Sequence, residues 1–111
     1  MTFVIQDKTV QAAFDQLKES VEPAAAARAM RERREYEAKR AKSQAFIDAQ
    51  GTIAEREHKA TLSQIYQDAI KGYHEAVERD EYYRNERNKC TLVIEAWRTC
   101  QSNFRAMAKV G

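Results

Sequence analysis

The sequence predicts an all-α protein: an antiparallel helical hairpin of coiled-coil type with a short N-terminal helix. One observation behind this prediction is an almost unbroken heptad in the second half of the chain. A second is a composition that suits a narrow seam between helices. A third is the scarcity of helix-breaking residues, which are limited to Pro23, Gly51, Gly72 and Gly111.

The heptad consists of positions spaced alternately four and three residues apart, most of them apolar or aromatic. They are Leu62, Tyr66, Ala69, Tyr73, Ala76, Asp80, Tyr83, Arg87, Cys90, Ile94, Trp97, Gln101, Phe104 and Ala108. This spacing keeps one stripe of a long helix facing a partner. The chain has 18 alanines but only 3 leucines among its 111 residues, so it fills a helix–helix seam better than a wide globular core.

The first element is a short helix expected over residues 7–21, where apolar residues from Val10 to Val21 repeat the same spacing. Pro23 disfavours helical geometry in the residue before it, but a proline suits the first turn of a helix. We therefore expect a kink or brief break at this point, followed by a first long helix over residues 23–50.

Gly51 marks the predicted reversal of the chain. A glycine ends many helices, and Thr52 with Glu55 fits a capping box that opens the next helix. So short a connection makes two helices antiparallel neighbours. The second long helix is expected over residues 52–108, and residues 1–111 are expected to form one domain.

Folding the chain at Gly51 sets a register in which paired residue numbers sum to about 104. The pairs include Val10 with Ile94, Phe14 with Cys90, Val21 with Tyr83, and Phe3 with Gln101. Arg87 faces Leu17 and is expected to keep its charged head in water. In the middle of the first arm, Arg33, Tyr36 and Arg40 are expected to occupy the seam.

A hairpin of two helices buries little apolar area by itself. Further apolar residues lie off the main stripe, namely Phe46, Ile65, Ile70, Val77, Val93 and Val110. These residues predict a second seam, and therefore a protein that associates with itself as a homo-oligomer.

No motif in the chain indicates catalysis, so neither a catalytic residue nor a cofactor is expected. Gly-x-Ser-x-Gly and glycine-rich phosphate loops are absent from the sequence. The Glu55-x-x-His58 pattern matches one piece of a di-iron site. The second piece is missing because Lys71 stands three residues before His74, so no metal is expected.

The compartment predicted from the sequence is the cytoplasm, without a membrane partner. No stretch approaches the roughly 18 to 20 apolar residues that span a bilayer, and the N-terminus lacks the layout of a signal peptide. Cys90 and Cys100 lie too far apart on one helix to form a disulfide, so reduced thiols are expected.

Two stretches of basic residues are candidate contacts for a phosphate-bearing or protein partner. The candidate residues are Arg28, Arg31, Arg34, Lys39, Lys42, Arg98 and Arg105. Lys and Arg neutralise phosphates, and exposed aromatic rings stack on unpaired bases. The alternative is a solvated helix surface held by ordinary pairs such as Arg31 with Glu35, with Trp97 and Phe104 in the seam.

One part of the chain resembles a known group of proteins. The residues that carry the resemblance are Gly51-Thr-Ile-Ala-Glu-Arg-Glu57, Ala60, the tyrosine-rich heptad, Ile94-Glu-Ala-Trp-Arg-Thr99, Gln101-Ser-Asn103 and Arg105-Ala106. Over about residues 45–108 the chain is similar to small uncharacterised helical phage and prophage accessory proteins, often associated with recombination or single-strand annealing. The resemblance implies a phage setting, and it supplies no catalytic residue or ligand.

Together these features predict a non-enzymatic phage accessory protein that binds another macromolecule, in the recombination or replication of phage DNA. Two alternatives remain open at the level of the sequence. One is direct binding of single-stranded nucleic acid through the basic stretches. The other is inhibition of a host defence protein, which would make a protein the partner.

Overall fold

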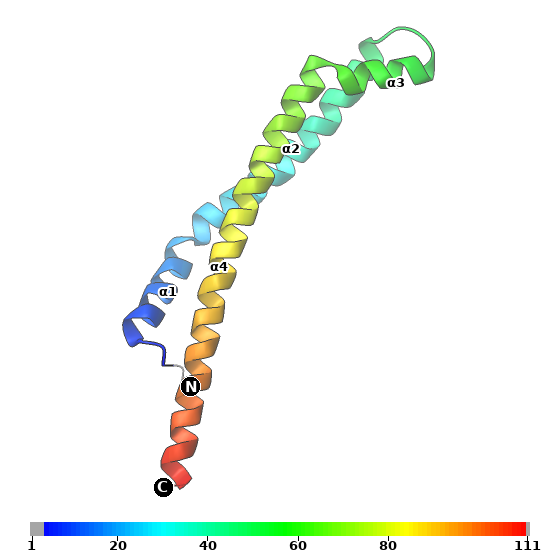
Figure 1. The fold of residues 1–111 in the computed structure, drawn as a ribbon. Coiled ribbons are helices and arrows are strands. Elements are labelled where there is room, and N and C mark those ends of the chain that lie inside the picture. The colour runs from blue at the N-terminus through cyan, green and yellow to red at the C-terminus, as the bar shows by residue number, and fades with distance from the viewer. Residues whose placement is uncertain (1–3, 111) are drawn as a thin grey trace. The chain divides into compact units, whose positions relative to one another are not determined.

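The computed structural model describes residues 4–110, and over this range the protein contains helices and no strand. The helices are α1 (Asp7–Glu19), α2 (Val21–Asp48), α3 (Ile53–Leu62) and α4 (Gln64–Val110). Segments from the two halves of the chain run antiparallel to each other (Figure 1). The prediction of an all-α antiparallel helical hairpin is therefore confirmed.

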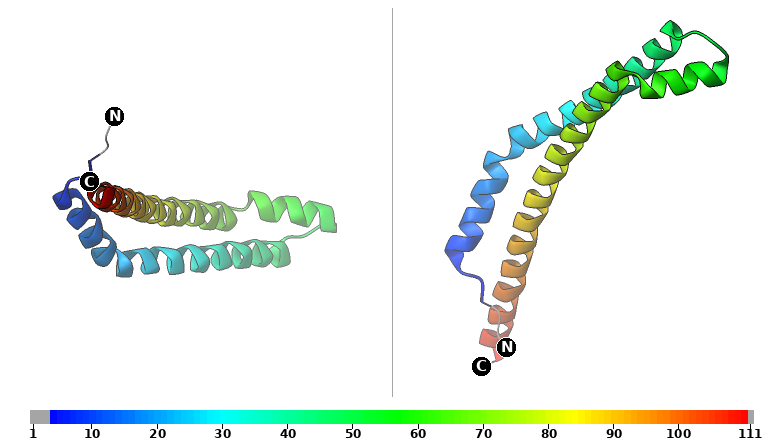
Figure 2. Two further views of the ribbon diagram at one scale, coloured as in Figure 1. Left: turned by 90° about the horizontal axis from the view of Figure 1, so that it is seen from below. Right: turned by 45° about the horizontal axis from the view of Figure 1, so that its top comes forward.

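The described residues form two compact units. One combines the segment that ends at Pro23 with the segment that begins at Tyr82, so it contains α1 and the C-terminal part of α4. The other unit, Ala24–Glu81, contains most of α2, all of α3 and the N-terminal part of α4. In every view of Figure 1 and Figure 2, α1 lies beside α4 within the first unit. The expectation of one domain over residues 1–111 stays a prediction.

Helix α1 ends at Glu19, two residues before the predicted end. The Ser20 amide donates to the Gln16 carbonyl, and the Ser20 hydroxyl donates to the Leu17 carbonyl at 3.3 Å. Ser20 thereby satisfies carbonyls that the helix end leaves open. The break thus falls at Ser20, and Pro23 lies in the first turn of α2, where its missing amide hydrogen has no helical partner to lose.

The reversal at Gly51 is confirmed, since Gly51 is the one described residue with a positive φ, +120°. The Thr52 hydroxyl accepts from the Glu55 amide at 3.2 Å, which is the predicted N-cap of α3. Helix α2 has no basic residue in its own last turn. Two basic side chains of α3 instead bind the carbonyls at and just beyond this helix end: Arg56 donates to the Phe46 carbonyl and Lys59 to the Gln50 carbonyl.

The prediction of one continuous helix over residues 52–108 is wrong, because the second arm is interrupted at Ser63. This residue has extended geometry (φ −65°, ψ 145°) and ends α3. Its hydroxyl donates to the Ala60 carbonyl at 2.6 Å and accepts from the Tyr66 amide at 3.4 Å. A serine hydroxyl that bonds to local backbone groups competes with the helical hydrogen bonds, which explains the break.

The unit that contains α1 has a small core of Val10 and Ala13 from α1 packed against Cys90 and Ile94 from α4. The predicted pairing of Val10 with Ile94 is therefore confirmed. The pairing of Phe14 with Cys90 is wrong, because Ala13 takes that place and Phe14 is 43% exposed. Val21 is likewise exposed. Phe3 lies outside the described residues.

Arg87 behaves differently from its prediction. It does face Leu17, but its guanidinium donates to the Leu17 carbonyl at 2.8 Å and to the Ser20 hydroxyl at 2.7 Å. Both bonds are partly buried. The charged head of Arg87 therefore caps the C-terminal end of α1 instead of remaining in water, which also favours the helix dipole.

The unit Ala24–Glu81 has a seam of alanines on its first arm. Spaced alternately three and four residues apart are Ala24, Ala27, Arg31, Arg34, Ala38, Ala41 and Ala45, of which Ala27, Ala38 and Ala41 are buried. Half-buried Tyr66 and Tyr73 of α4 belong to the opposite arm. The predicted seam residues Arg33, Tyr36 and Arg40 are exposed. That prediction is wrong, because the buried face of α2 is the one that carries the alanines. Small alanines allow a close approach of the arms that larger side chains prevent.

The predicted heptad of the second arm holds from Tyr66 to Gln101, where every position is buried or half-buried. It fails at both ends, since Leu62 is 77% exposed and Phe104 is 43% exposed. The residues predicted for a second seam remain partly or fully accessible, with Ile65 and Val110 exposed. Self-association stays a prediction.

Candidate functional site

Arg31, a candidate contact residue, is part of an ion-pair cluster in the unit Ala24–Glu81. Its guanidinium lies 3.0 Å from a carboxylate oxygen of Asp80 and 3.0 Å from one of Glu81. Asp80 is only 2% exposed. Hydrogen bonds to Glu81 and then to Asp80 raise the pKa of Arg31, so it stays charged at any physiological pH. Its charge is directed at these two carboxylates and thus bridges α2 and α4.

The neighbouring candidates in α2 are also paired with carboxylates. Arg34 lies 2.7 Å from Glu37, Lys39 lies 3.4 Å from Glu35, and Lys42 lies 3.6 Å from Glu57. The remaining candidate, Arg28, is exposed. Exposed pairs of this kind contribute only about 0–1 kcal/mol each. They nevertheless cancel the positive charge locally, so this stretch has a mixed surface rather than a continuous basic one.

The C-terminal part of α4 has a different charge distribution. Arg98 and Arg105 are exposed, and within residues 4–110 neither forms an ion pair or side-chain hydrogen bond. Lys109 follows four residues after Arg105 and is exposed as well. Positions seven and four residues apart share one face of a helix. We call Arg98, Arg105 and Lys109 the basic stripe.

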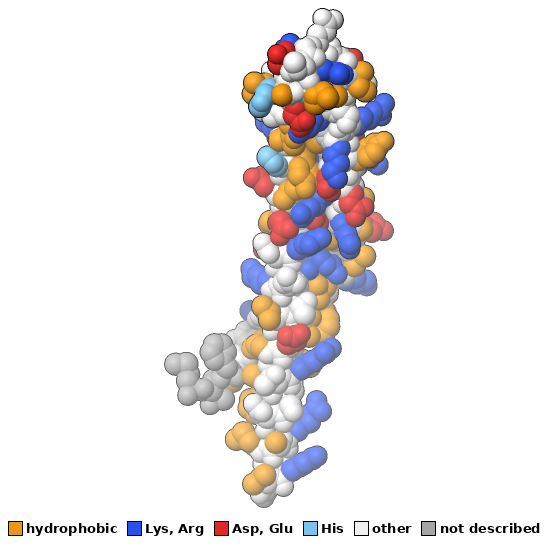
Figure 3. Space-filling view, turned by 90° about the vertical axis from the view of Figure 1, so that its right-hand side faces the viewer, with side chains coloured by type: hydrophobic (Ala, Val, Ile, Leu, Met, Phe, Trp, Pro, Cys, Tyr) orange, Lys and Arg blue, Asp and Glu red, His pale blue; other side chains and the backbone are white. Residues whose placement is uncertain are grey.

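No acidic residue occurs after Glu95 in the sequence, so nothing on this part of the helix neutralises the basic stripe. Figure 3 shows Lys and Arg along one edge of the C-terminal end, with hydrophobic side chains along the other edge. Over α2 and the N-terminal part of α4, acidic side chains alternate with basic ones in the same view. The basic stripe is therefore the part of the surface best suited to attract an anionic partner.

The aromatic residues near the basic stripe differ in accessibility. Trp97 is half-buried against the core of its unit, and its indole nitrogen donates to Asp7 at 3.3 Å. Phe104 precedes Arg105 and exposes 43% of its surface. Trp97 is therefore a packing residue, as predicted, whereas the ring of Phe104 is accessible to a partner.

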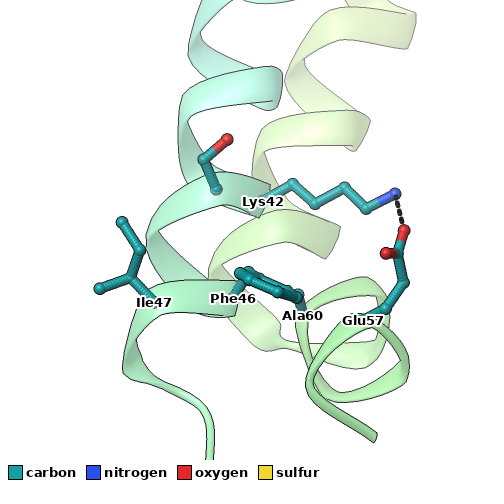
Figure 4. Close-up of a pocket in the computed structure, with 6 residues that line it drawn as sticks. Lys42, Phe46, Ile47, Glu57 and Ala60 are labelled. Atoms are coloured by element: carbon teal, nitrogen blue, oxygen red, sulfur yellow. Dashed lines mark ion pairs between the residues drawn. The ribbon is translucent and has the colours of Figure 1, made fainter. Parts of the chain in front are cut away.

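A second candidate site is a pocket between the end of α2 and α3, which we call the tip pocket. It has a volume of about 440 Å³ and is lined by Lys42, Ser43, Phe46, Ile47, Glu57 and Ala60. Figure 4 shows the Phe46 ring lying between the two helices, with the Lys42–Glu57 ion pair at one side. The Arg56 guanidinium lies over the Phe46 ring, 4.3 Å from the ring centroid. No sequence signal marked this pocket.

Residues 4–110 contain no group of three or more His, Cys, Asp or Glu side chains that could hold a metal ion. Glu55 and His58, which matched part of a di-iron motif, are both exposed. Cys90 is buried and Cys100 half-buried, and neither forms a disulfide. Among the helices of residues 4–110, none contains a segment whose length and hydrophobicity would suffice to span a bilayer.

Comparison with known proteins gives no match: no protein family, curated protein or solved structure is significantly similar to the chain.

Proposed function

We propose that this chain is a non-enzymatic phage accessory protein of the host cytoplasm that binds single-stranded nucleic acid, in the recombination or replication of phage DNA. The observation that carries the proposal is the basic stripe, whose three cations are exposed in a stretch of α4 without acidic residues. The phage setting rests on the resemblance of about residues 45–108 to phage and prophage accessory proteins.

The geometry favours α4 over α2 as the contact surface. A phosphate that approaches Arg34, Lys39 or Lys42 on α2 must displace a carboxylate. The other exposed arginines of α2 stand in a stretch where Glu32, Glu35 and Glu37 alternate with the cations. A phosphate that approaches the basic stripe displaces only water and counterions, and the release of counterions from the nucleic acid drives binding. Three cations along about 17 Å of helix, from Arg98 to Lys109, match a strand that lies along the helix axis.

A single strand suits this surface better than a duplex because its unpaired bases can stack on the exposed ring of Phe104, which lies about 100° around the helix from Arg105. Stacking of an unpaired base on an aromatic ring contributes about 1–3 kcal/mol and tolerates any base. The stripe offers no arrangement of side chains that reads base edges. The proposal is therefore for binding without sequence preference.

The direct test reverses two charges of the basic stripe. Arg98→Glu combined with Arg105→Glu should weaken binding of a fluorescent single-stranded oligonucleotide by about tenfold or more, because two phosphate contacts are lost. Arg33→Glu combined with Arg40→Glu is the matched control, since both residues are exposed and the net charge changes equally. Equal losses in the two variants would show a mere effect of net charge. No loss in either would contradict the proposal.

A second candidate function is binding of a host defence protein, and the tip pocket is the observation that favours it. The pocket is mostly apolar, and Ile47, which lines it, is 66% exposed. An exposed apolar patch marks a protein contact site. Ile47→Glu should then abolish capture of a host protein while oligonucleotide binding is unchanged.

A further inference from the structure

The C-terminal part of α4 has an apolar face that is distinct from the core and from the basic stripe. We call its residues the outer strip: Leu92, Ala96, Cys100, Asn103, Met107 and Val110. Leu92, Met107 and Val110 are exposed by 64%, 69% and 90%. These residues are spaced four, four, three, four and three positions apart, so they form one line along the helix.

The outer strip lies away from the residues that hold α1. The core of this unit uses Cys90 and Ile94 of α4. Leu92 and Ala96 are each two positions from a core residue, which turns them about 200° around the helix. A shallow groove of about 430 Å³ continues the strip toward Asn85. It is lined by Leu92, Val93 and Ala96, and also by Lys89 and by Ile5 of the segment before α1. The apolar face is therefore open along α4 over roughly 27 Å, from Leu92 to Val110.

The charge distribution limits what can cover the outer strip. None of its residues is charged, whereas Arg98 and Arg105 stand two positions before Cys100 and Met107, about 200° away. Figure 3 shows this separation of hydrophobic and basic side chains at the C-terminal end. A nucleic acid finds no cation on the strip between Leu92 and Val110, since Lys89 lies before it at the end of the groove. An anionic lipid surface that received the strip would have the basic stripe pointing away from its headgroups.

Asn103 favours a second helix as the partner that covers the outer strip. It is the only polar residue of the outer strip, and it lies between Cys100 and Met107 at heptad spacing. A single asparagine in an apolar helical seam pairs with the same residue of a second helix in a parallel dimer, and it fixes register and oligomeric state. Apolar residues on either side of it would be buried by the same contact.

We propose that the outer strip of α4 is the docking site of a second copy of this chain, which forms a parallel, in-register homodimer through Leu92, Asn103 and Met107. The two copies bury their apolar strips against each other, and Asn103 pairs with Asn103 of the second copy. Both basic stripes then face outward and do not repel each other across the contact. The dimer is independent of nucleic-acid binding and would present that surface twice.

The first test measures the mass of the particle by analytical ultracentrifugation at micromolar concentration. The parent should sediment as a dimer, and Met107→Glu should shift it to monomer by placing a charge in the contact. Ser102→Glu is the matched control, since Ser102 is exposed on the same segment but outside the strip. Circular dichroism should show both variants equally helical. A monomeric parent, or a dimer that survives Met107→Glu, would overturn the proposal.

The second test examines the parallel arrangement with a cysteine at one end of the outer strip, Val110→Cys combined with Cys100→Ser. The two copies of an end residue lie side by side in a parallel, in-register dimer, but about 27 Å apart in an antiparallel dimer centred on the strip. Mild oxidation should cross-link this variant, and Cys90 should take no part because it is buried in the core of each copy. A dimer without this cross-link would overturn the parallel arrangement. A monomer that binds anionic vesicles, and loses that binding with Met107→Glu, would assign the strip to a membrane surface instead.

Discussion

Gly51 has the backbone conformation on which the reversal between α2 and α3 depends. Its φ of +120° lies in the region that side chains with a Cβ rarely adopt. A Cβ at this position would also require the flexible Glu55 side chain to move. Gly72, by contrast, lies within α4, where a Cβ would meet only the Arg34 side chain at 3.9 Å. The turn therefore requires glycine at position 51, whereas the helix would accept alanine at position 72.

Gly51→Ala should lower the free energy of unfolding by about 1–3 kcal/mol, because alanine in this conformation is strained. Gly72→Ala should raise it by about 1 kcal/mol, because alanine favours the helix and fits the available space. Thermal denaturation followed by circular dichroism measures both effects. Equal melting temperatures for the two variants would show that the turn does not depend on glycine.

Helix α1 is held to α4 by a small number of contacts, and Trp97 is the largest side chain among them. It packs against the cluster of Val10, Ala13, Cys90 and Ile94 and donates to Asp7. Gln16 donates to Glu86 at 3.2 Å, and Arg87 caps the end of α1. Since most of these residues are small, the loss of one large ring removes a substantial share of the contact.

Trp97→Ala should destabilise this unit by about 2 kcal/mol, less than the loss expected for a fully buried tryptophan because the ring is half-buried. Amide hydrogen exchange should become faster in α1 before it changes in α3. Ser102→Ala, an exposed position on α4, is the control and should leave both melting and exchange unaltered. If Trp97→Ala leaves the amides of α1 protected from exchange but abolishes oligonucleotide binding, then Trp97 stacks on a base and is not a packing residue.

At the level of elements, the sequence predicted those features that depend on strong local signals. The heptad from Tyr66 to Gln101 and the reversal at Gly51 follow from periodicity and from the scarcity of glycine. The break at Ser63 was missed because serine is tolerated within helices, and its capping bonds become visible only in the structure. The alanine seam of α2 was missed because alanine is weakly hydrophobic, so larger residues such as Tyr36 dominated the assignment of the stripe.

The candidate site was predictable only in part, because the sequence does not show which cations form ion pairs. In the sequence, Arg31, Lys42 and Arg98 are equivalent positive charges. Only the structure shows that Arg31 faces Asp80 and Lys42 faces Glu57, whereas Arg98 faces solvent. Lys109 could have been found from its spacing to Arg105, since the two share a helix face. The tip pocket depends on the angle between α2 and α3, which no local pattern encodes.

At the scale of the whole molecule, the surface offers three regions of different chemistry. The basic stripe of α4 attracts phosphates, the outer strip of α4 is apolar, and the tip pocket lies at the junction of α2 and α3. We propose that the first binds single-stranded nucleic acid and that the second binds a second copy of the chain. These assignments are independent, because charge reversal and strip variants change different faces of α4.

The measurement that tests the central claim most directly is the salt dependence of oligonucleotide binding. Each phosphate neutralised on a single strand contributes about −0.7 to the slope of log K against log salt concentration, so three cations predict a slope of about −2 per chain. Lys109→Gln should reduce the magnitude of this slope by about 0.7, while Lys39→Gln should leave it unchanged. A parent protein whose binding does not weaken with salt, or a slope that Lys109→Gln does not alter, would contradict the assignment of the basic stripe.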